Sequence, residues 1–165
     1  MSSVRINTSE GEILIELEDS KTPKTVANFL GYVDAGFYNQ TIFHRVIKQF
    51  MIQGGGFDQN MLQKTAGATI ENEAASGLKN ETGTIAMARL PDPHSASAQF
   101  FINVANNQFL DFKAPTAEQY GYCAFGKVTS GLELVLKMST VPTGSKAGHQ
   151  DVPLSPLIVL SIERI

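Results

Sequence analysis

The chain has 165 residues, of which 42% are hydrophobic and 18% are charged, and its formal net charge is −3. This length and composition predict a single domain over residues 1–165 that buries roughly 70% of its unfolded surface. The slight negative charge excludes the basic field expected of a protein that binds nucleic acid or an anionic membrane.

The single cysteine, Cys123, excludes an internal disulfide and is typical of a reducing compartment. Residues 1–5 lead straight into patterned sequence, without the basic and apolar regions of a signal peptide. No window approaches the 18 or so apolar residues that span a membrane. We therefore expect a soluble cytoplasmic monomer.

The first elements are predicted by two different periods. Alternating residues predict strands over 4–6 and 12–17, joined as a hairpin. A helix follows, with Thr22 as its N-cap, Pro23 as its first residue and Gly36 at its end. Its apolar residues recur at helical spacing, at Val26, Phe29, Leu30 and Val33. One apolar face predicts a helix that covers one end of a sheet or barrel.

Residues 41–57, TIFHRVIKQFMIQGGGF, predict a hairpin with one arginine among large apolar side chains. A two-residue loop would place Arg45 opposite Ile52. A three-residue loop would place Arg45 opposite Gln53, so that an amide lies beside the guanidinium on one face of the sheet. We prefer the second register. A lone strand arginine usually lays its stem on the core and its head in water, so the pattern alone favours a structural role.

The remaining chain predicts further strands and one more helix. Strands are expected over 83–88, 98–104, 122–126 and 157–162, with a weak edge strand over 69–73. Gly126 is expected to end its strand, Ser130 and Glu133 to form the capping box of a second helix, and 143–153 to be irregular. The apolar side of that helix is predicted at Leu132, Val135 and Leu136. Without a βαβ rhythm, an antiparallel barrel capped by two helices fits best.

Three other patterns are weighed and set aside. Residues 121–127 match the start of a phosphate-binding loop, but Val128 stands where its hydroxyl residue belongs. The three histidines lack metal-ligand spacing, and Cys123 in an apolar strand is typical of inert core. His44 should point away from Arg45. We expect neither metal nor cofactor.

The string FHRVIKQFMIQGG resembles the hairpin pattern F-H-R-[VI]-I-x-x-F-M-[IV]-Q-G-G of the cyclophilins, which are peptidyl-prolyl cis–trans isomerases. Residues 83–88, 97–103 and 125–128 resemble three further strand motifs of that family. The resemblance implies a mainly β fold, an eight-stranded antiparallel closed barrel capped by two α-helices. It also reverses the interpretation of Arg45, which becomes the expected catalytic residue.

The resemblance carries further site residues onto this chain. Phe50, Met51, Phe101 and Leu110 match the proline pocket, Gln53 and Gln99 its polar wall, and Ala88, Arg89 and Leu90 the segment that holds the substrate backbone. Three positions depart from the common eukaryotic pattern: Arg89 replaces an asparagine, Phe109 a tryptophan and Tyr122 a histidine. These departures, with a shortened segment between Gly56 and Glu73 and the tail over 148–153, are similar to the bacterial cytoplasmic branch.

The implied function is isomerisation of X-Pro bonds in peptides and in unfolded or nascent proteins. The alternative is a proline-peptide binding module or chaperone with negligible turnover. Since Phe109 lacks the indole donor, the resemblance also implies that cyclosporin binds only weakly.

Overall fold

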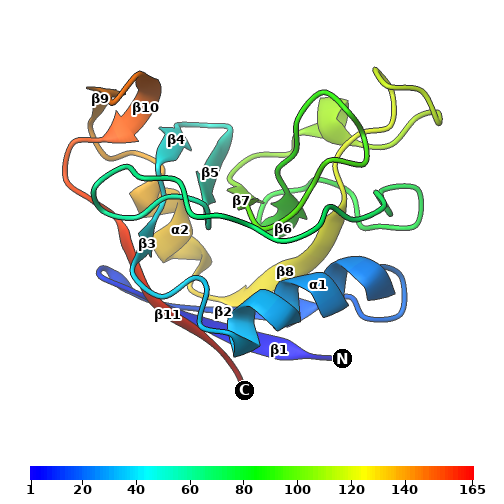
Figure 1. Cartoon of the computed structure of the whole chain (residues 1–165), viewed down its shortest axis with the longest axis horizontal. Coiled ribbons are helices and arrows are strands. Elements are labelled where there is room, and N and C mark those ends of the chain that lie inside the picture. The colour runs from blue at the N-terminus through cyan, green and yellow to red at the C-terminus, as the bar shows by residue number, and fades with distance from the viewer.

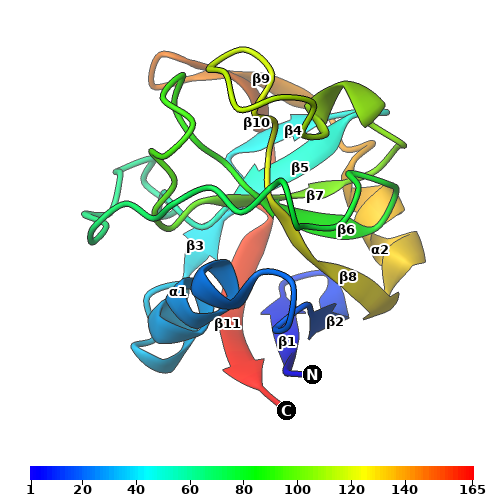
Figure 2. The ribbon, with the colours of Figure 1, turned by 90° about the vertical axis from the view of Figure 1, so that its right-hand side faces the viewer.

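Nine strands form one curled antiparallel sheet in the computed structural model, which describes residues 1–165 (Figures 1 and 2). The strand order is β3-β11-β1-β2-β8-β6-β7-β5-β4. The bounds of these strands are β1 Ser3–Thr8, β2 Gly11–Leu17, β3 Thr41–Ile42, β4 Arg45–Ile47, β5 Met51–Gly54, β6 Thr84–Met87, β7 Phe100–Asn103, β8 Ala124–Ser130 and β11 Ile158–Arg164. The expected mainly β, antiparallel architecture with two helices is confirmed.

The two edges of this sheet are consecutive in the chain. Only Phe43 and His44 separate β3, which pairs with β11, from β4, which pairs with β5. The chain thus changes partner across two buried residues, and the sheet curls back toward itself. The eight-stranded closed barrel that the resemblance implied is here a nine-stranded sheet whose edges, β3 and β4, are not paired with each other, and the strand expected over 42–47 is interrupted at Phe43 and His44.

Helix α1 (Pro23–Asp34) buries its predicted apolar stripe and packs against β11. Ala35 is the C-cap, and Gly36 follows in the left-handed conformation with φ of 69°. Thr22 occupies the N-cap position, but its hydroxyl donates to the carbonyl of Glu18 at 2.8 Å and makes no cap hydrogen bond. The predicted N-cap residue and first residue are therefore confirmed, although the side chain of Thr22 bonds to the preceding turn and not to the helix.

Helix α2 (Leu132–Met138) begins differently from the prediction. Gly131 is its N-cap, with φ of 92°, and no capping box forms. Because Ser130 is still part of β8, its side chain is not available as a cap. Val135 and Met138 are the buried residues of the helix, whereas Leu136 is 38% exposed. The predicted apolar side was therefore only partly right, because the buried residues of this seven-residue helix, which packs on β2, include Val135 and Met138 but not Leu136.

Three further strand predictions needed correction. Strand β8 continues through Gly126, because a Cβ there would lie 2.8 Å from the carbonyl oxygen of Glu16 and only glycine permits this approach. Residues 69–73 form no strand beyond one bridge, between Ile70 and Ala96. Residues 143–153 are not irregular, since β9 (Thr143–Lys146) and β10 (His149–Pro153) form a small hairpin whose β10 packs on β4.

The strands carry apolar side chains on both faces. Inside the curled sheet lies a large core with aromatic residues Phe29, Tyr38, Phe100 and Phe125, all at most 1% exposed. On the other face lies a small separate cluster, made of Met51, Ala86, Phe101, Leu110 and Ala124. This second cluster forms the floor of the candidate site. Neither helix is long and apolar enough to cross a membrane.

Candidate active site

The β4–β5 hairpin has the predicted three-residue register. Arg45 pairs with Gln53, and Ile47 pairs with Met51. The turn is closed by the N–H of Phe50, which donates to the carbonyl of Ile47 at 3.1 Å. Because paired residues share a face, the guanidinium, the amide and the thioether are presented on the same outer side of the sheet.

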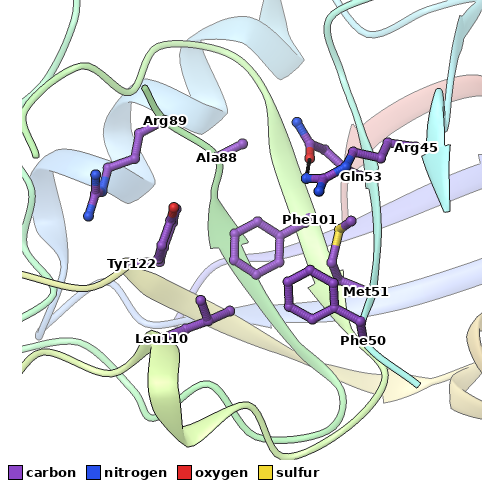
Figure 3. A pocket seen from close by; sticks show the side chains of 9 residues that line it. All are labelled: Arg45, Phe50, Met51, Gln53, Ala88, Arg89, Phe101, Leu110 and Tyr122. Atoms are coloured by element: carbon purple, nitrogen blue, oxygen red, sulfur yellow. Dashed lines mark hydrogen bonds between the residues drawn. The ribbon is translucent and has the colours of Figure 1, made fainter. Parts of the chain in front are cut away.

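A chain of amides orients the arginine. Nη1 of Arg45 donates to Oε1 of Gln53 at 3.3 Å (Figure 3). Nε2 of Gln53 in turn donates to Oε1 of Gln99 at 3.0 Å. Gln99 fits here because Gly56 lacks a side chain: a Cβ at that position would lie 2.5 Å from the amide carbon of Gln99. Arg45 is exposed and forms no ion pair, so its charge is available to a ligand.

Nine of the twelve predicted site residues surround one pocket. Its volume is about 130 Å³, well below the roughly 300–1,000 Å³ typical of sites for drug-sized ligands, so it suits a single small side chain. In Figure 3 Phe101 lies between Arg45 and Gln53 on one side and Arg89 and Tyr122 on the other. The lining residues are Arg45, Phe50, Met51, Gln53, Ala88, Arg89, Phe101, Leu110 and Tyr122.

The other three predicted residues lie around this pocket and not in its lining. Phe109 is 65% exposed, and its ring stacks on Phe50 with the ring centres 5.8 Å apart. Leu90 is 70% exposed, and with Gln99 it lines a neighbouring cavity of about 210 Å³ that shares Ala88 with the pocket.

Arg89 and Tyr122 form one wall together. The guanidinium carbon of Arg89 lies 4.4 Å from the centre of the Tyr122 ring, which in turn packs edge-on against Phe101 with ring centres 5.8 Å apart. Nε and Nη2 of Arg89 donate to the carbonyl of Gly121 at 3.1 and 3.0 Å. The sequence predicted both residues separately but gave no sign of this contact.

A buried amide network behind the pocket was missed. The side-chain amide of Asn107 donates to the carbonyl of Phe50 at 2.9 Å, and that of Asn80 donates to the carbonyls of Leu110 at 3.2 Å and Tyr122 at 3.1 Å. Asn103 bonds to both asparagines and is fully buried. Three pocket residues are therefore held by their backbones. The sequence signal was Asn103, which alternation had placed on the face of Phe101.

His44 points away from Arg45, as predicted. It is 5% exposed, its ring centre lies 4.3 Å from that of Phe57, and its Nδ1 has no hydrogen-bond partner. Burial, helped by nearby His149 and Arg45, lowers the pKa of His44 to about 4. Burial likewise raises the pKa of the Cys123 thiol to about 11, which makes it a poor nucleophile at neutral pH.

Comparison with known proteins places this geometry in a family. Residues 3–164 match the family model described as cyclophilin type peptidyl-prolyl cis-trans isomerase/CLD. The chain is 55% identical to peptidyl-prolyl cis-trans isomerase cyp18 of Streptomyces antibioticus over 161 residues, 98% of this chain and 97% of the relative. It is 52% identical to peptidyl-prolyl cis-trans isomerase B of Escherichia coli (strain K12) over 159 residues, 96% of this chain and 97% of the relative.

A solved structure agrees with these sequence relatives. The cyclophilin type peptidyl-prolyl cis-trans isomerase of Cryptosporidium parvum superposes with a TM-score of 0.82 at 30% identity, covering 99% of this chain and 97% of that one. The same protein was solved in the presence of the dipeptide Ala-Pro, where the TM-score is 0.80 at 31% identity, covering 98% of this chain and 97% of that one. The chain therefore belongs to the cyclophilin-type peptidyl-prolyl cis–trans isomerase family.

Proposed function

We propose that this protein accelerates cis–trans rotation of X-Pro peptide bonds and that Arg45 is its catalytic residue. The single observation that carries the proposal is an unpaired guanidinium at the edge of a small pocket floored by Met51, Phe101 and Leu110. The pocket matches a proline ring in size and polarity. The Ala-Pro dipeptide of the Cryptosporidium parvum structure supports a ligand of this class.

The reaction requires only a modest lowering of the rotation barrier by the site. The barrier to peptide rotation is about 18–20 kcal/mol, because the nitrogen lone pair is shared with the carbonyl. Spontaneous X-Pro exchange takes roughly 10–100 s. Turnover on the order of 10–1000 per second therefore needs the barrier lowered by only about 3–7 kcal/mol. No bond breaks and no proton moves, so the chemistry needs no nucleophile or metal.

Arg45 supplies this stabilisation in the twisted state. As the amide rotates, the prolyl nitrogen becomes pyramidal and regains a lone pair that accepts a hydrogen bond. The planar nitrogen of the ground state is a poor acceptor, so a guanidinium aimed at it by Gln53 favours the transition state selectively. The apolar floor also disfavours the charge-separated planar amide. Arginine suits this position because it stays charged beside apolar groups.

The substrate backbone is proposed to lie along residues 88–90. Neither the backbone N–H nor the backbone C=O of Arg89 is bonded to another part of the chain, although the neighbouring N–H groups of Ala88 and Leu90 donate to Gln99 and Ser95. A free donor and acceptor at the pocket mouth suit an extended peptide.

An NMR exchange experiment on a short Ala-Pro peptide tests the proposal. We expect catalytic amounts of the protein to broaden the cis and trans signals or to produce exchange cross-peaks between them. Without the protein, the two isomers exchange too slowly for either effect. Saturable binding without faster exchange would overturn the isomerase and leave the alternative, a binding module for proline peptides. Absence of both binding and exchange would overturn the pocket itself.

We further propose that the clients are unfolded or nascent proteins and that the protein works as a cytoplasmic monomer. The exposed, shallow pocket supports access to extended chains, and the one buried thiol suits a reducing compartment. Sedimentation of the purified protein and fractionation of source cells test these points. A stable dimer or a membrane or secreted fraction would contradict them.

A further inference from the structure

Arg89 is the second cation of the pocket, and it has no acidic partner. None of the four ion pairs in the structure includes Arg89 or Arg45. The nine residues that line the pocket include these two arginines and no carboxylate. The two cations stand on opposite sides of the pocket floor (Figure 3). A proline held between them therefore lies in a positive field.

The guanidinium of Arg89 is held in place without being neutralised. Its Nε and Nη2 bond to the carbonyl of Gly121, its Nη1 donates to the carbonyl of Leu90 at 2.9 Å, and its plane lies over the Tyr122 ring. Carbonyl dipoles and a ring face fix the orientation of a cation, but they leave its unit charge. Because the side chain is ordered before a ligand arrives, little entropy is lost when a ligand charge approaches.

Two acidic residues share a second cavity with Arg89, outside the pocket lining. Asp111 and Glu118 line a neighbouring cavity together with Arg89, and Lys113 lies among them. Oδ1 of Asp111 accepts a hydrogen bond from the backbone N–H of Asn80 at 2.7 Å, and Asp111 forms no ion pair with Arg89. Of these four charged residues, only Arg89 also lines the proline pocket. The only charged side chains that line the pocket itself are therefore the two arginines.

We propose that Arg89 is a specificity-determining residue that makes the enzyme prefer X-Pro substrates carrying a carboxylate side chain within two residues of the proline. The proposal rests on the proposed isomerase function and names a substrate class for it. On the substrate path proposed above, along residues 88–90, flanking side chains pass close to this guanidinium. A glutamate there gains an attraction and a lysine a repulsion, both weakened by solvent because Arg89 is only half-buried.

The test uses matched peptides that differ at one position flanking the proline, with Glu, Gln or Lys, scanned over the two residues on each side. We expect the ratio of kcat/KM for Glu over Lys to reach about 3- to 10-fold at one or more positions in low salt, the scale of exposed ion pairs, and to shrink at high salt. The charge effect should appear mainly in KM, since it acts on binding and not on the twisting amide.

Variants separate charge from packing. Arg89→Gln should bring the Glu-over-Lys ratio close to one, whereas Arg89→Lys should keep most of it even if the lost carbonyl contacts lower activity on all peptides. Lys113→Gln, which makes the same change of net charge outside the pocket, should leave the ratio unchanged. A wild-type ratio near one at every position, or a ratio that survives in Arg89→Gln, would overturn the proposal. Failure of the wild type to accelerate any peptide would instead overturn the isomerase function.

Discussion

The two faces of strands β5 and β7 serve different purposes. Ile52, Phe100 and Ile102 point into the large core, while Met51, Phe101 and Asn103 point outward to the pocket or its buried amide support. Inside, aromatic rings are sealed: Phe100 meets Phe29, Tyr38 and Phe43 at centre distances of 5.4 to 6.2 Å. Outside, the apolar cluster has only five buried residues and lies beneath an open pocket. Alternate residues of each strand thus belong either to the core or to the candidate site.

The largest effect tests that division directly on neighbouring phenylalanines. Phe100→Ala should cost about 3–5 kcal/mol of unfolding free energy, because it leaves a sealed cavity. Phe101→Ala should cost only about 1.5–3 kcal/mol, since it widens a pocket that is already open at the surface, but it should remove most activity. Urea unfolding and the peptide exchange assay measure both. Equal losses of unfolding free energy in Phe100→Ala and Phe101→Ala would show that the two faces do not differ in this way.

Arg45→Ala should lower kcat/KM by roughly 100-fold or more, the scale of one lost transition-state donor, or about 2.7 kcal/mol. Its stability should stay within about 0.5 kcal/mol of the wild type, since the side chain is exposed and unpaired. Lys48→Ala, in the loop of the same hairpin, is the matched control and should keep activity. Near-full turnover in a folded Arg45→Ala protein would remove Arg45 from the mechanism.

His44, the buried neighbour of Arg45, should govern acid stability. Its pKa of about 4 in the folded protein lies below the usual 6.5, so the unfolded chain binds the extra proton first. Stability present above pH 6.5 is therefore lost as pH falls toward 4, by on the order of 2–3 kcal/mol. His44→Gln should flatten this slope in pH-dependent urea titrations, whereas His94→Gln, at an exposed site, should retain it. An unchanged slope in His44→Gln would contradict the assignment.

The smallest effect concerns the pocket rim. We expect the wild type to bind cyclosporin weakly, because Phe109 offers apolar area but no hydrogen-bond donor. Phe109→Trp should tighten the Kd by at least about tenfold, from a recovered hydrogen bond of roughly 1–3 kcal/mol, with little change in peptide turnover. Phe109→Leu should bring no gain. Calorimetry decides: nanomolar affinity in the wild type, or no gain with tryptophan, would disprove the role of this position.

Prediction from sequence succeeded where a local period set the answer. The alternating pattern predicted that Arg45, Gln53 and Phe101 lie on the outward face of the sheet. The register of the β4–β5 hairpin was chosen because it places the amide of Gln53 beside the charge of Arg45, and the structure has this register. The start of α2 was misjudged because Gly131, in a left-handed conformation, takes the cap position that Ser130 seemed to offer. A capping motif identifies residues that can cap, but the preceding strand decides which residue is free to do so.

The missed parts of the site depend on contacts between distant residues. Asn80 lies 23 residues before Asn103, and the pair forms a support with the nearby Asn107 only when the fold brings them together behind the pocket. The contact of Arg89 with Tyr122 likewise joins residues 33 positions apart, and the polar β9–β10 hairpin has no apolar alternation to reveal it. Such features carry no periodic signal within a short window.

The meeting of the sheet edges at Phe43 and His44 also bears on aggregation. Long exposed edge strands recruit other extended chains by main-chain pairing. Here the edges are two short strands, β3 and β4, and β10 packs against β4. The edges of the sheet therefore offer almost no free ladder of backbone groups to which another extended chain could add as a strand.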